Sequence, residues 1–176
     1  MSSAKWWRLS QGPIDLEMIR PQVERSLSDA RGGKPFFLSM HYTAPHWPWE
    51  SRYDAAIAAD VRSSLFHLDG GNIETYRRMI HHMDEGIGWV VDALRKEQLL
   101  DNTLIVFTSD NGGERFSDNW PLVGGKMDLT EGGIRVPWIA HWPAQIAPGG
   151  TSGQPCMTMD WSATMLDAAE IGRAHV

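Results

Sequence analysis

The longest periodic segment of the sequence, residues 72–98, constrains the fold more than any other feature. Its apolar residues recur at steps of three and four, which predicts one long amphipathic helix. Asn72 is the expected N-cap. Gly86 and Gly88 lie inside the helix at a cost of about 1 kcal/mol each, so we expect the helix to pack closely against another backbone there. The apolar stripe consists of Ile73, Tyr76, Ile80, Met83, Ile87, Val90, Val91 and Leu94.

Three compact apolar runs predict strands on either side of this helix. They are residues 35–42, 103–108 and 136–142, and all are rich in aromatic or branched side chains. Residues 43–71 carry prolines and look irregular, with one helical turn expected around 54–59. A strand, a long helix and a further strand joined by short links predict an α/β fold, with a central, mostly parallel or mixed sheet flanked by helices.

Two shorter helices complete the expected architecture. Residues 21–31 read as a helix with Pro21 at its first position, because proline lacks the N–H that would be unpaired there anyway. Residues 160–169 read as a second helix with Asp160 as the N-cap.

Composition excludes several classes of protein. The chain has 176 residues, of which 42% are hydrophobic and 22% charged, values typical of a globular domain. Its net charge of −6 argues against binding to nucleic acid or to an anionic membrane. The apolar runs are too short to span a bilayer. A single cysteine, Cys156, excludes an intramolecular disulfide and a multi-thiolate zinc site.

The residues that follow the 103–108 strand are candidates for metal binding. Asp110 and Asn111 present a carboxylate and an amide carbonyl, the hard oxygen ligands that calcium or magnesium prefers. Gly112 and Gly113 then allow a sharp backbone turn. Ligands collect at the carboxyl ends of strands in open α/β sheets, which favours a site here. Taken alone, the four residues are more typical of an Asx turn that ends a strand than of a metal site.

Two further side chains could contact an anion. His46 follows the 35–42 strand and lies between two prolines, which would stiffen its loop and hold the imidazole for proton donation or anion binding. Lys126 follows two glycines, so that its backbone and its ammonium could both approach an anion. In isolation each has a plainer interpretation, namely a surface histidine in a proline-rich loop and a solvated lysine.

Other candidate positions are weaker. His81 and Glu85 have the i, i+4 spacing of a helical metal site, but a solvated helix face is the commoner outcome. Five residues after the Asp110–Gly113 turn are either rim contacts for a ligand or part of a solvated loop. They are Glu114, Arg115, Ser117, Asp118 and Trp120.

Four blocks in order give the chain a family resemblance. Residues 34–48 resemble the sulfatase segment in which a strand runs into an A-P-H-x-P loop. Residues 102–113 resemble the family's strand ending in D-N-G, and residues 124–143 its G-x-K…E-G-G-I-R-V-P…W-P block. Residues 160–169 resemble the helix that follows. Order and spacing agree over residues 20–169, so residues 1–176 look like part of a sulfatase catalytic domain of the alkaline-phosphatase-like superfamily.

The resemblance implies roles for four residues. Asp110 and Asn111 would be two ligands of a calcium ion, with magnesium less expected. Lys126 would contact the sulfate and the ester oxygen. His46 would contact the sulfate and help to protonate the leaving group. These residue types suit the reaction, because cleavage of a sulfate ester gathers negative charge on the sulfuryl oxygens and on the departing oxygen.

The sequence also departs from the family. The family nucleophile is a formylglycine made from a cysteine in a C-x-P/A-x-R motif, and this chain contains no such motif; the segment around Cys156 does not match it. The upstream acidic pair of the calcium site is also missing. We therefore expect a truncated domain that is inactive alone, with the formylglycine in the parent protein. Residues 170–176 do not follow the family pattern and are expected to be a non-native tail.

Several alternatives stay open at this stage. The same scaffold serves phosphonate monoester and phosphodiester hydrolases, and a catalytically inactive sulfatase-like module would keep the fold without the nucleophile. The expected partner is a small-molecule or saccharide sulfate ester. The N-terminal residues do not show the charged start and apolar run expected of a signal peptide. This pattern fits a cytoplasmic protein, and it fits equally a true start further upstream. Many family members are exported, which makes a periplasmic or secreted parent one alternative.

Overall fold

The computed structural model describes residues 7–8, 16–47, 49 and 71–171. The chain divides into two compact units, Met1–Ile146 and Ala147–Val176. The helical turn expected around residues 54–59 lies outside the described residues.

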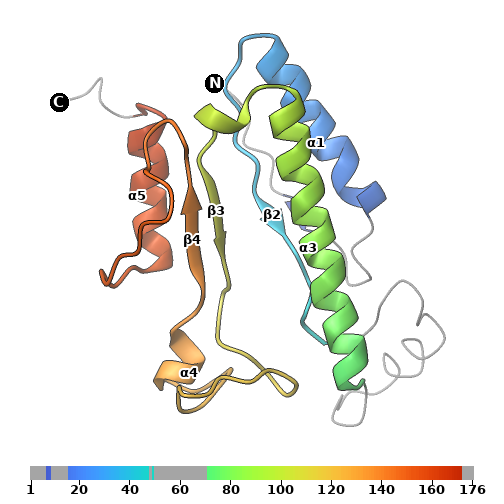
Figure 1. Ribbon diagram of the computed structural model, residues 1–176, viewed down its shortest axis with the longest axis vertical. Coiled ribbons are helices and arrows are strands. Elements are labelled where there is room, and N and C mark those ends of the chain that lie inside the picture. The colour runs from blue at the N-terminus through green and yellow to red at the C-terminus, as the bar shows by residue number, and fades with distance from the viewer. Residues whose placement is uncertain (1–6, 9–15, 48, 50–70, 172–176) are drawn as a thin grey trace. The chain divides into compact units, whose positions relative to one another are not determined.

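Two helices form the core of the first unit. Helix α1 spans Leu16–Arg31 and helix α3 spans Ile73–Lys96, and the two pack against each other (Figure 1). Side chains from both helices build the buried cluster, which contains Ile19, Val23, Leu27 and Leu94. Removing apolar side chains of this kind from water is the main favourable term in folding.

Helix α1 begins five residues before the predicted start, so the prediction that Pro21 occupies its first position is wrong. Pro21 lies inside the helix, where it removes a hydrogen bond at a cost of about 3 kcal/mol. The reason is visible in the core. Ile19, Val23 and Leu27 are spaced by four residues and all are buried, so the buried face extends across the proline. The burial of these side chains outweighs the cost of the lost hydrogen bond.

The long helix α3 matches its predicted position to within two residues at either end. Asn72 is the N-cap, as predicted, and its side-chain oxygen accepts a hydrogen bond of 2.9 Å from the backbone N–H of Thr75. The buried positions are Thr75, Met79, Gly86 and Leu94. Ile73 and Ile80 belong to the predicted apolar stripe, but their side chains are 39% and 38% exposed. The apolar stripe is therefore wider than the face that the rest of the unit covers.

The two glycines inside α3 have different surroundings. A Cβ atom on Gly86 would lie 3.2 Å from the hydroxyl oxygen of Tyr42 and 3.4 Å from the Cδ1 atom of Ile19. Close packing is thus confirmed at Gly86, but against side chains rather than a backbone. A Cβ atom on Gly88 would meet no described residue within 4 Å, so the expected close contact is not seen there in the described part of the chain.

Four short strands form two pairs. Strand β1 (Trp7–Arg8) runs parallel to β2 (Met40–His41), and β3 (Ile105–Thr108) runs antiparallel to β4 (Trp138–His141). The three predicted strands are all present but shorter than predicted. Residues 35–39, for example, have no ladder partner in the described part of the chain, and a strand is defined by its partner. The pairing confirms a partial α/β domain with mixed strand directions.

The strands cover the helical core. Met40 and Tyr42 from β2 and its continuation, and Ile105 from β3, pack against the buried cluster of α1 and α3. In Figure 1 the arrows of β2 and β3 both point towards the end of the unit where the short helix α4 (Glu131–Ile134) lies. The loops that follow these two strands therefore emerge at the same end. A 3-10 turn, η2 (Leu100–Asn102), links α3 to β3.

The second unit contains helix α5, Thr158–Ala168. The helix begins two residues before the predicted start, so Asp160 is not its N-cap. Met157 is the N-cap, and the carboxylate of Asp160 accepts a hydrogen bond of 2.7 Å from the Met157 N–H. An acidic side chain in the first turn can accept a hydrogen bond from an N–H that has no partner within the helix, and its charge interacts favourably with the helix dipole. A carboxylate therefore suits the N-cap and the first turn alike. Among the described residues, no helix combines the length and hydropathy needed to cross a membrane.

Candidate functional site

The candidate site begins at the carboxyl end of β3. There the chain enters the glycine-rich loop, defined here as residues 109–135. The Ser109 hydroxyl donates a hydrogen bond of 3.0 Å to the carbonyl of Asn111, which closes the turn that carries Asp110. The Asp110 side chain is exposed and Asn111 is half-buried. The Gly112 N–H donates to the carbonyl of Gly133 over 2.8 Å, so this turn is tied directly to helix α4.

Glycines make the loop possible, because its backbone segments touch where side chains would have to lie. A Cβ atom on Gly112 would lie 1.8 Å from the carbonyl oxygen of Gly132, and one on Gly132 would lie 2.1 Å from that of Gly124. Gly124 also has a φ of +85°, a conformation that favours glycine. Gly132 and Gly133 of α4 are both buried. The loop is therefore held by backbone contacts rather than by an apolar core.

Lys126 is fixed at both its backbone and its side chain. Its N–H donates a hydrogen bond of 2.9 Å to the carbonyl of Gly113, and its ammonium Nζ lies 3.1 Å from Oε2 of Glu114. The Lys126 side chain is 23% exposed. These contacts exclude the plainer interpretation of a fully solvated lysine. They place Lys126 against the segment that directly follows the Asp110–Asn111 turn.

Asn119 holds the two arms of the loop together. Its side-chain amide donates to the carbonyl of Gly124 over 3.0 Å and to that of Gly113 over 3.4 Å. The backbone carbonyl of Asn119 accepts a hydrogen bond of 2.8 Å from the N–H of Leu122. Sequence reasoning missed Asn119, since nothing in its local pattern reveals an amide that joins residues five and six positions away on opposite arms.

His46 lies in the loop that follows β2. The His46 N–H donates to the carbonyl of Thr43 over 2.7 Å, which forms a turn, and the Ala44–Pro45 peptide bond is cis. Its ring nitrogen Nδ1 lies 2.5 Å from the carbonyl oxygen of Trp47. A carbonyl can only accept, so Nδ1 carries the proton and Nε2 is the nitrogen left to face another group. The ring itself is exposed.

Aromatic contacts join the His46 loop to the glycine-rich loop. The ring of Trp49, which is 3% exposed, meets the edge of Phe116 with 4.8 Å between ring centroids. The Arg115 guanidinium lies over both rings, 5.7 Å from the Trp49 centroid and 5.2 Å from that of Phe116. Tyr76 of α3 lies 6.1 Å from Phe116, and burial raises the pKa of the Tyr76 hydroxyl. Sequence reasoning missed this cluster because its members are distant in the chain.

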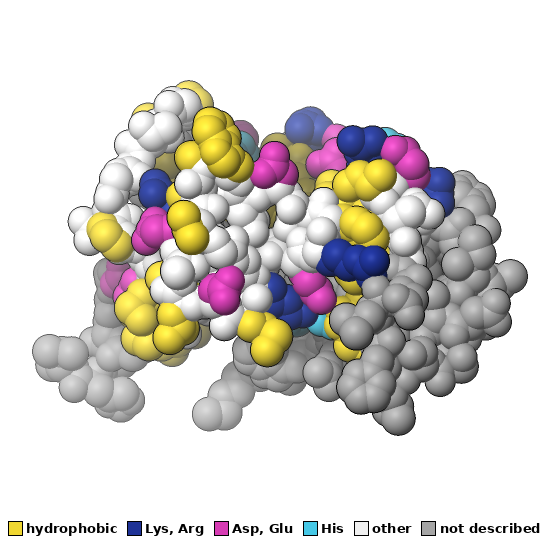
Figure 2. All heavy atoms as spheres, turned by 90° about the horizontal axis from the view of Figure 1, so that it is seen from below, with side chains coloured by type: hydrophobic (Ala, Val, Ile, Leu, Met, Phe, Trp, Pro, Cys, Tyr) yellow, Lys and Arg dark blue, Asp and Glu magenta, His cyan; other side chains and the backbone are white. Residues whose placement is uncertain are grey.

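The structure thus brings the predicted residues together to different degrees. Lys126 is bonded to the segment next to Asp110 and Asn111. Among the described residues, the contacts that link the His46 loop to that segment are those of Trp49 with Phe116 and Arg115. Of the rim candidates, Glu114 pairs with Lys126 and Arg115 covers the aromatic rings, while Trp120 is 85% exposed. Figure 2 looks onto this end of the structure, where acidic and basic side chains lie among exposed apolar ones.

The weaker metal candidate behaves as an ordinary helix face. His81 Nε2 and Glu85 Oε1 lie 3.4 Å apart, and their side chains are 69% and 45% exposed. Among the described residues, no group of three or more His, Cys, Asp or Glu side chains is arranged to hold a metal ion.

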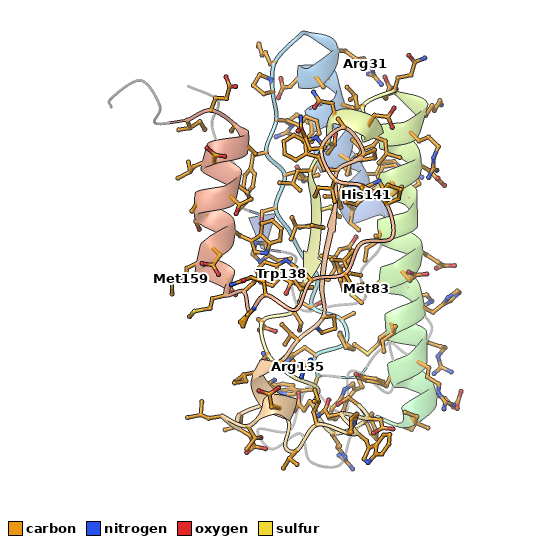
Figure 3. All side chains as sticks on the ribbon, turned by 60° about the vertical axis from the view of Figure 1, so that its left-hand side comes forward. Arg31, Met83, Arg135, Trp138, His141 and Met159 are labelled. Atoms are coloured by element: carbon orange, nitrogen blue, oxygen red, sulfur yellow. The ribbon has the colours of Figure 1, made fainter. Side chains whose placement is uncertain are left out.

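Figure 3 shows His141 and Trp138 on β4, with Arg135 nearer α4. The carboxylate of Glu131 pairs with the guanidinium of Arg135 at 3.2 Å.

Comparison with known proteins identifies the family. The family model described as Sulfatase matches residues 7–171. The chain belongs to the sulfatase family. Mouse arylsulfatase J is 30% identical over 168 residues, covering 93% of this chain and 27% of the relative. Human N-acetylgalactosamine-6-sulfatase is 32% identical over 141 residues, covering 77% of this chain and 25% of the relative.

Two solved structures share the fold of this chain. The crystal structure of Ps i-CgsB superposes with a TM-score of 0.72 and 34% identity, covering 89% of this chain and 34% of that chain. PsFucS1 sulfatase from Pseudoalteromonas sp. gives a TM-score of 0.65 and 28% identity, covering 93% of this chain and 31% of that chain. The chain therefore spans about a quarter of the length of these curated relatives and about a third of these solved structures.

Proposed function

We propose that this chain forms part of the active site of a sulfatase that hydrolyses sulfate esters of saccharides. The observation that supports the proposal is the partly buried ammonium of Lys126, which is paired with Glu114 in the segment that directly follows the Asp110–Asn111 turn. Ligands of open α/β sheets collect at this end of the strands. Family membership supplies the reaction class.

Lys126 would contact the sulfate and the ester oxygen. Its ammonium has three donors, of which Glu114 accepts one, so that donors remain for an anion. During cleavage, negative charge grows on the departing oxygen. A positive group already held in place stabilises this charge without first having to be ordered.

His46 would donate a proton to the leaving group. The hydrogen bond from Nδ1 to Trp47 orients the ring and leaves Nε2 as the nitrogen that can face another group. An imidazole that is protonated at both nitrogens can then give its Nε2 proton to the departing alkoxide. The packing of Trp49 on Phe116 keeps the His46 loop beside the glycine-rich loop.

Asp110 and Asn111 would contribute two oxygen ligands to a calcium ion, with magnesium a less favoured occupant. The Asp110 carboxylate is exposed and, in the described part of the chain, has neither a hydrogen bond nor an ion pair, so it is available to a cation. Calcium takes six to eight oxygen ligands, and the remaining ones would have to come from elsewhere in the parent protein. When bound, the ion would neutralise charge on the sulfate.

The saccharide part of the proposal rests on the relatives. One is named N-acetylgalactosamine-6-sulfatase, and the Ps i-CgsB structure was also solved in complex with k-i-k-neocarrahexaose, at 33% identity to this chain. The nucleophile, a formylglycine in the family, would lie in a part of the parent protein outside this sequence. We therefore propose that the 176-residue chain alone does not hydrolyse sulfate esters.

The function can be tested in two steps. First, incubation of the chain with an aryl sulfate and calcium should give no turnover above a Lys126→Ala control; turnover above that control contradicts the proposed inactivity. Second, the full-length parent gene should encode a C-x-P/A-x-R motif and hydrolyse saccharide sulfates. There, Lys126→Ala should lower kcat/KM by about 100-fold or more. A preference for phosphonate or phosphate diesters would reassign the substrate class, and a parent gene without the motif would indicate an inactive module.

A further inference from the structure

The ion pair between Lys126 and Glu114 differs from the local ion pairs of the helices. Those pairs are exposed and join residues three or four apart, as in Arg77–Glu74, where the side chains are 68% and 65% exposed. Lys126 and Glu114 are twelve residues apart, and their side chains are only 23% and 34% exposed. Screening by solvent is weaker for such a pair, so each partner restricts the other more strongly.

The backbone on the Glu114 side is itself fixed. The Glu114 carbonyl accepts hydrogen bonds from both the N–H and the hydroxyl of Ser117, and Gly113 accepts from the Lys126 N–H. Gly113 has no room for a side chain, because a Cβ atom there would lie 2.0 Å from Oγ of Ser117. The carboxylate is thus presented from a rigid turn, and it holds the far end of a lysine whose near end is already bonded to the same turn.

We propose that Glu114 is a positioning residue for Lys126. Its carboxylate holds the ammonium beside the Asp110–Asn111 turn before an anion arrives, and it keeps one ammonium proton while the others point to the anion. A free lysine side chain populates many rotamers, and ordering it on binding weakens the affinity. Glu114 also repels an anion. If Glu114 mainly positions Lys126, removing its carboxylate should weaken sulfate binding. If its charge mainly repels the anion, removing the carboxylate should strengthen sulfate binding.

The inference rests on the proposed function, and one NMR experiment on the full 176-residue chain tests the two separately. The chain has only four lysines, so the lysine side-chain signals are few. Wild type, Glu114→Gln, Lys126→Ala and Glu131→Gln would each be titrated with inorganic sulfate. Glu131→Gln removes the same charge from an exposed pair in the same loop and serves as the matched control.

In wild type we expect restricted motion of the Lys126 methylenes and a sulfate-dependent shift that Lys126→Ala abolishes. Glu114→Gln, which keeps the side-chain shape, should free the Lys126 methylenes and weaken sulfate binding about 5- to 10-fold, with the unfolding midpoint unchanged. Glu131→Gln should match wild type. Equal or tighter binding by Glu114→Gln overturns the inference and leaves the proposed function standing. Absence of a sulfate response in wild type overturns both.

Discussion

The helical core and the glycine-rich loop of the first unit are stabilised in opposite ways. In the core, side chains such as Val23 and Leu94 are buried, at 2% and 4% exposure, between the helices. In the loop, the large side chains of Met127 and Leu129 are 93% and 91% exposed, while the backbone is packed so closely that several positions admit only glycine. A core of side chains tolerates changes of shape better than a packed backbone does, because side chains can adjust. Substitutions should therefore separate the two regions.

The largest effect is expected from Gly112→Ala. The added methyl group would lie 1.8 Å from the Gly132 carbonyl oxygen, and backbone cannot move aside as a flexible side chain can. We expect a loss of more than about 4 kcal/mol from the stability of the loop, measured by hydrogen exchange of its amides. Exchange in α1 and α3 should stay slow. A Gly112→Ala variant with unchanged exchange in the loop would contradict the close backbone packing.

Leu94→Ala should have the next largest effect, because it opens a cavity in the helical core. We expect a loss of about 3 kcal/mol in the free energy of unfolding, measured by urea denaturation. Leu129→Ala is the matched control, since the same atoms are removed from a side chain that is 91% exposed. It should change stability by less than about 0.5 kcal/mol. Similar losses in the two variants would show that the apolar loop surface is buried after all.

The next prediction is a loss of stability in alkaline solution, which should be smaller than the loss caused by Leu94→Ala. Burial raises the pKa of the Tyr42 hydroxyl to about 12, from about 10 in the unfolded chain. The folded state therefore holds this proton more tightly, and the stability that results is complete below pH 10 and lost as the pH rises from 10 to 12. After allowance for partial solvation, we expect about 2 kcal/mol of loss.

Tyr42→Phe should remove this pH dependence. The Tyr42 hydroxyl is buried and has no hydrogen-bond partner among the described residues, so the substitution should leave stability at pH 7 equal or slightly higher. Urea denaturation at pH 7 and at several values between 10 and 12 measures both effects. An unchanged alkaline slope in Tyr42→Phe would assign the effect to other groups.

The smallest difference is expected between two glycines of the same helix. Gly88→Ala places a methyl group in open space and should raise stability by up to about 1 kcal/mol, through helix propensity. Gly86→Ala would bring its methyl group within 3.2 Å of the Tyr42 hydroxyl, and this crowding should cancel the gain. Thermal unfolding of the two variants compares them directly. Equal stabilisation by both would mean that the Tyr42 contact is loose.

The same contrast explains what could be predicted from the sequence. Periodicity located α3, its cap at Asn72 and the 103–108 strand, because these features depend on neighbours in the chain. It failed for Pro21, where buried side chains override local preference. The Asp110–Asn111 turn and Lys126 were found from motifs. Glu114 was found as a rim candidate, but its pairing with Lys126 was not predicted, and Asn119 was not found at all. Those roles depend on backbone segments that meet only after folding.

The central claim is that Asp110, Asn111, Lys126 and His46 lie around one site for a cation and an anion. Titration of the chain with Mn²⁺, a paramagnetic ion that prefers oxygen ligands, tests this claim most directly by NMR line broadening. We expect the signals of Asp110 and Asn111 to broaden first and those of Lys126 and His46 to broaden in the same titration. Broadening centred on His81 and Glu85, with these four residues unaffected, would contradict it.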